Sequence, residues 1–339
     1  MICAPAMRPV AEMPPCGAQT FAREQRPLYR PVVIRAIAAD WPVVRTAQQG
    51  NGALLDQIRA MDSGAAAETM IAPQAARGRF FYADDMRGFN FRREQLSLGD
   101  LAEHLALIET DPEPIGIYAG AAAAERHLPG FTQANPFPLA EAAQAQCRLW
   151  LGNATQVAAH FDLSDNFAVV AAGRRTFTLF PPEQAENLYV GPLDRTLAGQ
   201  PVSMVDPLAP DLDRYPRFAK ASEQGLCAVL DPGDAIFIPA LWWHHVAASS
   251  PVNLLVNYWH NDAPRGGGFL AMIHALMAIR DLPPAERRAW KSWFDTFVFG
   301  DGAPTAFDHL PDHARGVTGP VGPERDAVIR QFLVTILGS

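Results

Sequence analysis

The sequence predicts a mainly β protein with added helices, and three observations support this fold class. Short runs of apolar residues fill most of residues 145–262, glycine and proline separate these runs, and the apolar spacing becomes helical after Gly268. The 30 prolines and 25 glycines form no low-complexity tract, so they indicate short elements joined by defined turns. Many short strands with such turns favour a β-sandwich or a barrel.

The composition of the 339 residues excludes several classes of protein. Apolar residues make up 49% and charged residues 19%, so the chain can bury a sizeable core and is not a disordered chain. The 28 Lys and Arg against 36 Asp and Glu give a net charge of −8, which argues against nucleic acid or an anionic membrane as a partner. No apolar run approaches the roughly 18 residues of a membrane span. Four scattered cysteines without a Cys-x-x-Cys pair indicate reduced thiols, so we expect a cytoplasmic protein.

The N-terminal part predicts a mixture of strands and helices. We interpret the Pro-rich residues 1–30 as an extended arm over the surface. Ser97 is a predicted N-cap, because it directly precedes a segment with apolar residues at helical spacing. The other expected elements are strands at 31–36, 79–82 and 115–118, helices at 53–61 and 98–108, and a loop or short helix in the Ala-rich stretch 119–124.

The densest β-region and a helical C-terminal region follow. The predicted strands are rich in β-branched and aromatic residues and end at glycine or proline. They lie at 148–151, 167–170, 176–180, 228–230, 235–238 and 252–258. The predicted C-terminal helices lie at 269–279, 284–299 and 324–337.

The segment around His160 carries the clearest chemical signal. Residues i and i+2 of a strand point to the same face, so His160 and Asp162 face one cavity. A third ligand is available from His244 or His245, of which only one faces the cavity because adjacent side chains of an extended segment point oppositely. Two histidines and one carboxylate are the usual ligands of non-haem Fe(II) oxygenases. The alternative is a pair of histidines packed in an aromatic core.

Further motifs surround these candidates in a fixed order. With them, the chain resembles the JmjC-type cupin family, closest to the branch of the asparaginyl hydroxylase that inhibits hypoxia-inducible factor. The similarity covers about residues 118–262 and, more weakly, 32–41. The motifs that carry it are His160-Phe-Asp162-Leu-Ser-Asp-Asn166, Gly173-Arg-Arg175-Thr-Phe-Thr-Leu-Phe180-Pro-Pro, Leu188-Tyr189, Asp213-Arg-Tyr-Pro-Arg-Phe218, Pro232-Gly-Asp234-Ala-Ile-Phe-Ile-Pro239, Trp242-Trp243-His244-His245 and Val256-Asn257-Tyr-Trp259.

The resemblance implies a fold, a cofactor set and a domain organisation. The fold is a double-stranded β-helix, the cupin or jelly-roll fold, in a catalytic domain at 1–263 with N-terminal α/β elements. The cofactors are Fe(II), the cosubstrate 2-oxoglutarate and O2. In the family the first histidine of Trp-His-His is the ligand, which makes His160, Asp162 and His244 the catalytic metal ligands. The helical region 264–339 would form a homodimer, although amphipathic helices that merely cover the barrel have the same spacing.

The same resemblance implies residues that bind the cosubstrate and the substrate. Arg175 stands where the family has a lysine for the distal carboxylate of 2-oxoglutarate, a role that a guanidinium can fill with two hydrogen bonds. Tyr118, Asn166 and Asn257 match cosubstrate-binding residues, and Trp259 matches an aromatic residue of the substrate cavity. The alternatives are a surface ion pair for the arginine and ordinary core or turn positions for the other four.

Two positions depart from the family pattern. Val157 replaces a threonine that usually lies three residues before the first ligand, so one hydrogen bond to the cosubstrate is missing or supplied differently. Ala119 and Gly120 replace a polar residue that the compared enzyme directs toward its protein substrate, so the substrate's identity is not transferable. We therefore predict a 2-oxoglutarate-dependent dioxygenase that hydroxylates a protein or peptide side chain. The alternatives are a hydroxylase of a small molecule, such as an amino acid or a natural-product intermediate, and a non-enzymatic cupin that binds a metal or ligand.

Overall fold

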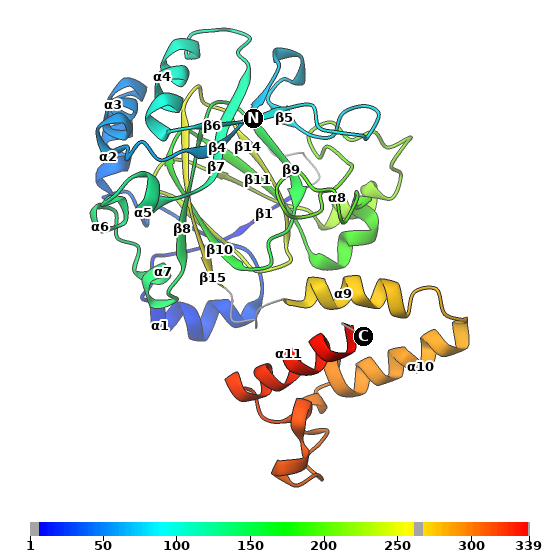
Figure 1. Ribbon diagram of the computed structural model, residues 1–339. Helices are drawn as coiled ribbons and strands as arrows, with labels where there is room; N and C mark the ends of the chain where they lie inside the picture. The colour runs from blue at the N-terminus through cyan, green and yellow to red at the C-terminus, as the bar shows by residue number, and fades with distance from the viewer. Residues whose placement is uncertain (1–6, 261–266, 338–339) are drawn as a thin grey trace. The chain divides into compact units, whose positions relative to one another are not determined.

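The computed structural model describes residues 7–260 and 267–337, which belong to two compact units (Figure 1). The expected domain boundary between residues 263 and 264 lies outside the described residues. Within the described ranges, no helix has the length and apolar character that crossing a membrane requires.

The first unit is built on two β-sheets. The smaller has six strands, in the order β1 (Arg8–Pro9), β12 (Leu226–Leu230), β11 (Arg175–Phe180), β14 (Trp243–Ala248), β9 (Gln156–His160) and β5 (Arg79–Phe80). The larger has nine strands, in the order β2 (Ala11–Met13), β3 (Val32–Ile34), β13 (Ala235–Ile238), β10 (Asp165–Ala172), β15 (Asn253–His260), β8 (Gln146–Gly152), β7 (Gly116–Ala123), β4 (Ala67–Ala72) and β6 (Arg92–Leu96).

The strands from β8 to β15 confirm the expected jelly-roll core. Strands β8, β10, β13 and β15 lie side by side in the larger sheet, and β9, β11, β12 and β14 lie side by side in the smaller one. The neighbours within each set pair antiparallel, and the chain passes repeatedly from one sheet to the other. Side chains of both sheets, such as Val170 and Phe177, meet in one buried cluster between them. The fold class is therefore the predicted one.

Helices cover the outer face of the larger sheet and lie along one side of the two sheets (Figure 1). Leu55 and Leu101 from these helices share a buried cluster with Leu151 and Val256 of the sheet. Ser97 forms the predicted N-cap, accepting a hydrogen bond of 3.0 Å from the backbone N–H of Asp100. The α-helices of this unit are α1 (Ala18–Thr20), α2 (Pro42–Gln48), α3 (Asn51–Met61), α4 (Leu98–Ile108), α5 (Ala124–His127), α6 (Phe131–Ala134), α7 (Pro138–Ala142) and α8 (Phe218–Gln224). The short π- and 3₁₀-helical turns are η1 (Phe21–Gln25), η2 (Arg26–Leu28), η3 (Gln74–Ala76) and η4 (Pro182–Leu188).

Three expectations from the sequence are wrong. Residues 1–30 are not simply an extended arm, because their described part forms β1, β2 and the helical turns α1, η1 and η2. The stretch 119–124 continues strand β7 as far as Ala123, with an irregularity between Ala119 and Ala122, because pairing with β8 overrides the helix propensity of alanine. Cys16 and Cys147 are free thiols, but Cys227 is disulfide-bonded.

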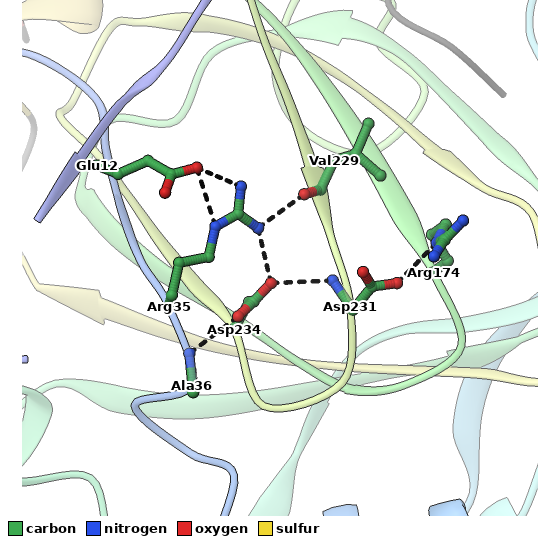
Figure 2. A network of polar contacts seen from close by, with 7 residues as sticks. All are labelled: Glu12, Arg35, Ala36, Arg174, Val229, Asp231 and Asp234. Atoms are coloured by element: carbon green, nitrogen blue, oxygen red, sulfur yellow. Dashed lines mark hydrogen bonds and ion pairs between the residues drawn. The ribbon is translucent and has the colours of Figure 1, made fainter. Parts of the chain in front are cut away.

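Asp234 joins the N-terminal segment to the turn between β12 and β13 (Figure 2). Its carboxylate accepts hydrogen bonds from the backbone N–H groups of Ala36 at 2.9 Å and Asp231 at 3.1 Å, and from Nη1 of Arg35 at 2.7 Å. The guanidinium of Arg35 also contacts Glu12 of β2. Asp234 is buried, so loss of its carboxylate would leave several polar groups without partners.

We expect Asp234→Ala to lower the free energy of unfolding by about 2–4 kcal/mol, because it leaves two backbone donors without their acceptor and removes one of the ion pairs of Arg35. Urea unfolding of the purified protein measures this change. Asp231→Ala is the matched control, since that side chain pairs with the exposed Arg174 and with no other described residue, and should contribute about 0–1 kcal/mol. Equal effects of the two substitutions would contradict the assignment.

The second unit is helical, as predicted. Its elements are α9 (Gly267–Ala278), α10 (Pro284–Phe294), η5 (Asp295–Phe299), η6 (Ala303–Thr305), η7 (Asp312–Ala314), η8 (Gly316–Thr318) and α11 (Pro323–Leu337). The helix expected at 284–299 changes at Phe294 from α-helical to π-helical geometry. No residue between 267 and 336 is buried, and several large apolar side chains there are exposed, among them Leu270, Trp293 and Phe332.

Candidate metal centre

The three predicted ligands come together at one end of the smaller sheet. His160 ends β9 and lies directly opposite His244 of the neighbouring strand β14, with the two ring centroids 4.3 Å apart. Asp162 follows His160 by two residues, and its Oδ2 lies 3.7 Å from Nε2 of His244. The three ligand atoms all lie within 4.8 Å of one another, so these side chains can hold one metal ion.

Backbone carbonyls fix the orientation of both imidazole rings. Nδ1 of His160 lies 2.9 Å from the carbonyl oxygen of Ala158, and Nδ1 of His244 lies 3.0 Å from that of Trp242. Because a carbonyl oxygen can only accept, each Nδ1 donates to its carbonyl, which leaves each Nε2 as the ring atom that can bind a metal. Burial, and next the nearby His160, lower the pKa of His244 to about 4, so this ring is neutral at pH 7 and ready to bind a metal.

His245 is not part of this ligand set. On β14 it lies opposite Thr178 of β11, whereas His244 lies opposite Leu179, so the two side chains point to different faces of the sheet. His245 is buried, and burial lowers its pKa to about 4. The sequence motif alone did not decide which of the two histidines is the metal ligand, and the geometry favours His244.

A cavity of about 520 Å³ contains the three ligands and all five other predicted site residues. The rest of its wall is mostly apolar and aromatic, with Phe80, Phe91, Trp150 and Phe177 among its residues. A larger surface cavity of about 710 Å³ elsewhere contains none of the predicted site residues. The metal ligands therefore lie in a pocket that can admit a small ligand together with part of a substrate.

Arg175 is a buried cation without a counter-ion among the described residues. It begins β11 just after Gly173, whose φ of +73° forms the turn, and a Cβ at Gly173 would lie 2.1 Å from Oδ1 of Asn253. Arg174 points outward to Asp231, but Arg175 is only 6% exposed. Its Nε has no hydrogen-bond partner, and no carboxylate of the described residues pairs with it. Burial lowers its pKa to about 10, so it remains charged at pH 7.

Tyr118 lies in the same cavity as Arg175, and so does Val157, the residue that replaces the family threonine. The hydroxyl of Tyr118 donates to Sδ of Met70 at 3.0 Å, a weak acceptor. Burial raises the pKa of this phenol, so it is a neutral donor. The phenol can therefore exchange its sulfur contact for a better acceptor on a bound ligand.

The two predicted asparagines form a hydrogen-bonded chain to the metal ligand. Nδ2 of Asn257 donates to Oδ1 of Asn166 at 2.8 Å, and Nδ2 of Asn166 donates to Oδ2 of Asp162 at 3.2 Å. Oδ1 of Asn257 is buried and has no partner. These two hydrogen bonds hold the Asp162 carboxylate in place. Cosubstrate binding by the two asparagines stays a prediction.

Trp259 lies at the cavity wall with its ring 5.3 Å from that of Trp150, in an edge-to-face arrangement. Trp150, Met70 and Arg93 are cavity residues that sequence reasoning missed. Alternation in the predicted strand 148–151 could have identified Trp150, because it lies between two buried leucines. The loop residues 196–200 also line the cavity, and no periodic pattern marks them in the sequence.

Comparison with known proteins agrees with this geometry. Residues 18–266 match the family described as Cupin-like domain. The chain belongs to this family. It is 26% identical over 292 residues to the bifunctional peptidase and (3S)-lysyl hydroxylase JMJD7 of Homo sapiens, which covers 77% of this chain and 86% of that protein. It is 40% identical over 93 residues to tRNA wybutosine-synthesizing protein 5 of Mus musculus, 27% of each chain. Lysine-specific demethylase 8 of Xenopus tropicalis is 34% identical over 111 residues, 32% of this chain and 24% of that protein.

These relatives support the assignment to the cupin and JmjC family, and they identify neither the branch of the family nor the substrate. The matched segments span only about a quarter of the mouse and frog proteins. None of these three relatives is an asparaginyl hydroxylase by name, so that branch stays a prediction. The names of the three proteins also differ in what they act on, so the family alone does not identify a substrate.

We expect Arg175→Met to raise the free energy of unfolding by about 1–3 kcal/mol in the absence of metal and 2-oxoglutarate. The substitution replaces a buried charge, with which no carboxylate of the described ranges pairs, by an apolar side chain of similar length. Arg174→Met is the matched control and should change stability by no more than about 0.5 kcal/mol, since its guanidinium is exposed. Chemical unfolding of both variants measures this, and a clear loss of stability in Arg175→Met would show that the charge has a partner in the folded protein.

Proposed function

We propose that this protein is an Fe(II)- and 2-oxoglutarate-dependent oxygenase that hydroxylates a protein or peptide side chain. The observation that carries the proposal is the presence, in one cavity, of a two-histidine, one-carboxylate ligand set and a buried arginine for which the described part of the chain supplies no counter-ion. The ligand set suits a non-haem Fe(II) ion. The buried cation is costly unless an anion binds to it, and a dicarboxylate that also reaches the metal meets both requirements.

Each residue of the site has a distinct part in this function. His160, Asp162 and His244 would hold the metal through two Nε2 atoms and a carboxylate oxygen. Arg175 would bind the distal carboxylate of 2-oxoglutarate through charge-assisted hydrogen bonds, with the hydroxyl of Tyr118 as a further donor. Fe(II), 2-oxoglutarate and O2 would together supply the oxidising chemistry that converts a C–H bond into a hydroxyl group.

The other cavity residues position groups and exclude water. Asn166 and Asn257 hold the Asp162 carboxylate at a fixed angle. Trp150 and Trp259 provide an apolar surface against which the reacting part of a substrate can pack. This arrangement needs no protein general base, because the residues only bind and orient the reactants.

The proposal predicts that purified protein with Fe(II) releases succinate from 2-oxoglutarate, and that His160→Ala abolishes the release. Arg175→Met should raise the KM for 2-oxoglutarate about tenfold or more, since a hydrogen bond to a charged group contributes about 1.5–3 kcal/mol. Arg174→Met, whose side chain points outward, should leave the KM unchanged. Absence of both succinate formation and metal-dependent 2-oxoglutarate binding would contradict the proposal and favour a non-enzymatic cupin.

Incubation with candidate substrates separates the two substrate classes. JMJD7 is a lysyl hydroxylase by name, which supports a protein or peptide substrate for this chain. A peptide digest and a set of free amino acids, each added to the succinate assay, distinguish that class from small molecules. The substrate is the molecule that stimulates succinate release and gains the mass of one oxygen atom. The net charge of −8 keeps nucleic acid an unfavoured substrate.

We also propose that the C-terminal helices form a homodimer in the full chain. Residues 267–336 include no buried side chain, so a core of their own does not stabilise them. The exposed apolar residues of α11, among them Phe332, Leu333 and Ile336, would be covered by a second copy.

Light scattering during size-exclusion chromatography is expected to give the mass of a dimer for the wild type. Phe332→Glu should shift this mass toward that of the monomer, because it places a charge within the apolar contact. Gln331→Glu, at an exposed polar position of the same helix, is the control and should remain dimeric. A wild-type chain that is monomeric at micromolar concentration would contradict the proposal.

A further inference from the structure

The two segments that carry the metal ligands touch each other at one junction. The turn after β9 contains Asp162 and leads to Asp165, and the turn after β13 leads to His244. The backbone N–H of Leu241 donates to the carbonyl oxygen of Asp162 at 2.8 Å, and that of Ala240 donates to Oδ1 of Asp165 at 3.0 Å. The position of His244 relative to Asp162 therefore depends on this contact between turns.

Leu241 is held in an unfavourable backbone conformation at this junction. Its φ is +66°, in the left-handed region, which costs a non-glycine residue roughly 1–2 kcal/mol. Such a conformation persists only where surrounding contacts hold it. Leu241 lies three residues before His244, so relaxation of its backbone would move a metal ligand.

A segment near the N-terminus contacts both turns. We call residues 26–29, Arg26 to Tyr29, the strap. Nε of Arg26 forms an ion pair with Oδ2 of Asp165 at 2.8 Å, and the Asp165 side chain is only 14% exposed. The hydroxyl of Tyr29 donates to the carbonyl oxygen of Ala240, and the indole N–H of Trp242 donates to the carbonyl oxygen of Tyr29 at 3.0 Å.

The strap is itself anchored to the sheet that carries the junction. Strand β3 begins at Val32, shortly after the strap, and pairs with β13, which ends at Ile238 just before the second turn. The strap thus contacts the first turn through Asp165 and the second through Ala240 and Trp242. A contact on both sides can fix the distance between them.

We infer that the strap positions the metal ligands, with Arg26 and Tyr29 as positioning residues that act through Asp165 and Ala240. The inference rests on the proposed function, because it requires a metal at His160, Asp162 and His244. Outer contacts that orient metal ligands typically change metal affinity by 10–100-fold when they are removed. We expect the strap to act at the lower end of that range, since it touches the turns rather than the ligand side chains.

The test is titration of the metal-free protein with Co(II), followed by its visible absorption spectrum. Tyr29→Phe removes only the hydroxyl of a residue that is 45% exposed, and Arg26→Met removes the ion pair. Each variant should weaken Co(II) binding about tenfold and change the shape of the absorption bands, which report the geometry around the metal. Arg26→Lys keeps a positive charge near Asp165 and should recover part of the affinity.

Arg23→Met is the matched control. It lies in η1, just before the strap, its side chain is 77% exposed, and among the described residues it pairs only with its neighbour Glu24. Its Co(II) affinity and spectrum should equal those of the wild type. Thermal unfolding without metal separates loss of fold from loss of ligand geometry, because a purely structural role would lower the unfolding temperature and leave the spectrum unchanged.

The outcomes distinguish this inference from the proposed function. Wild-type protein that binds no Co(II), or binds it equally well after His160→Ala, contradicts the proposed metal centre and the inference with it. Wild-type protein that needs His160, while Tyr29→Phe and Arg26→Met bind Co(II) with unchanged affinity and spectrum, overturns the role of the strap alone. Weaker binding with altered bands in both variants supports it.

Discussion

The antiparallel pairing of β9 with β14 is the constraint on which the site depends. It places His160 opposite His244, and Asp162, in the turn that directly follows β9, lies at the same end of the sheet. A shift of one residue in this register would bring His245 forward and turn His244 to the other face. The neighbouring strand β11 fixes the register from the other side of β14 and also supplies Arg175 to the same cavity. One set of strand pairings thus positions the ligand set and the buried cation together.

Much of the fold and of the ligand set could be predicted from the sequence, because both follow from local patterns. Short apolar runs between glycine and proline gave the jelly-roll strands, and the i, i+2 spacing of His160 and Asp162 needed only strand geometry. The choice between His244 and His245 could not be made from the residues alone, since it depends on which face of β14 is turned inward. The resemblance to JmjC-type cupins indicated His244, in agreement with the geometry.

The features that the sequence did not predict depend on contacts between distant segments. The hydroxyl of Tyr29 donates to the carbonyl oxygen of Ala240, which lies 211 positions later in the sequence. No sequence pattern around either residue predicts this contact. The strand character of Ala122 and Ala123 comes from pairing with β8, which alanine's own preference for helices conceals. The lack of a counter-ion for Arg175 within residues 7–260 and 267–337 is likewise visible only in three dimensions, because an acidic neighbour could have come from any of these segments.

The strands β1 and β2 have a consequence for how the chain folds. Strand β1 pairs parallel with β12 in the smaller sheet, and β2 pairs parallel with β3 in the larger sheet. The residues of β12 lie more than 200 positions after those of β1 in the sequence. Loop closure over such a separation is slow, so this edge of the smaller sheet completes late in folding. Until then β12 presents unpaired backbone groups that can recruit a strand from another molecule. We therefore expect the tendency of this protein to aggregate to be greatest before its N-terminal residues pair with β12.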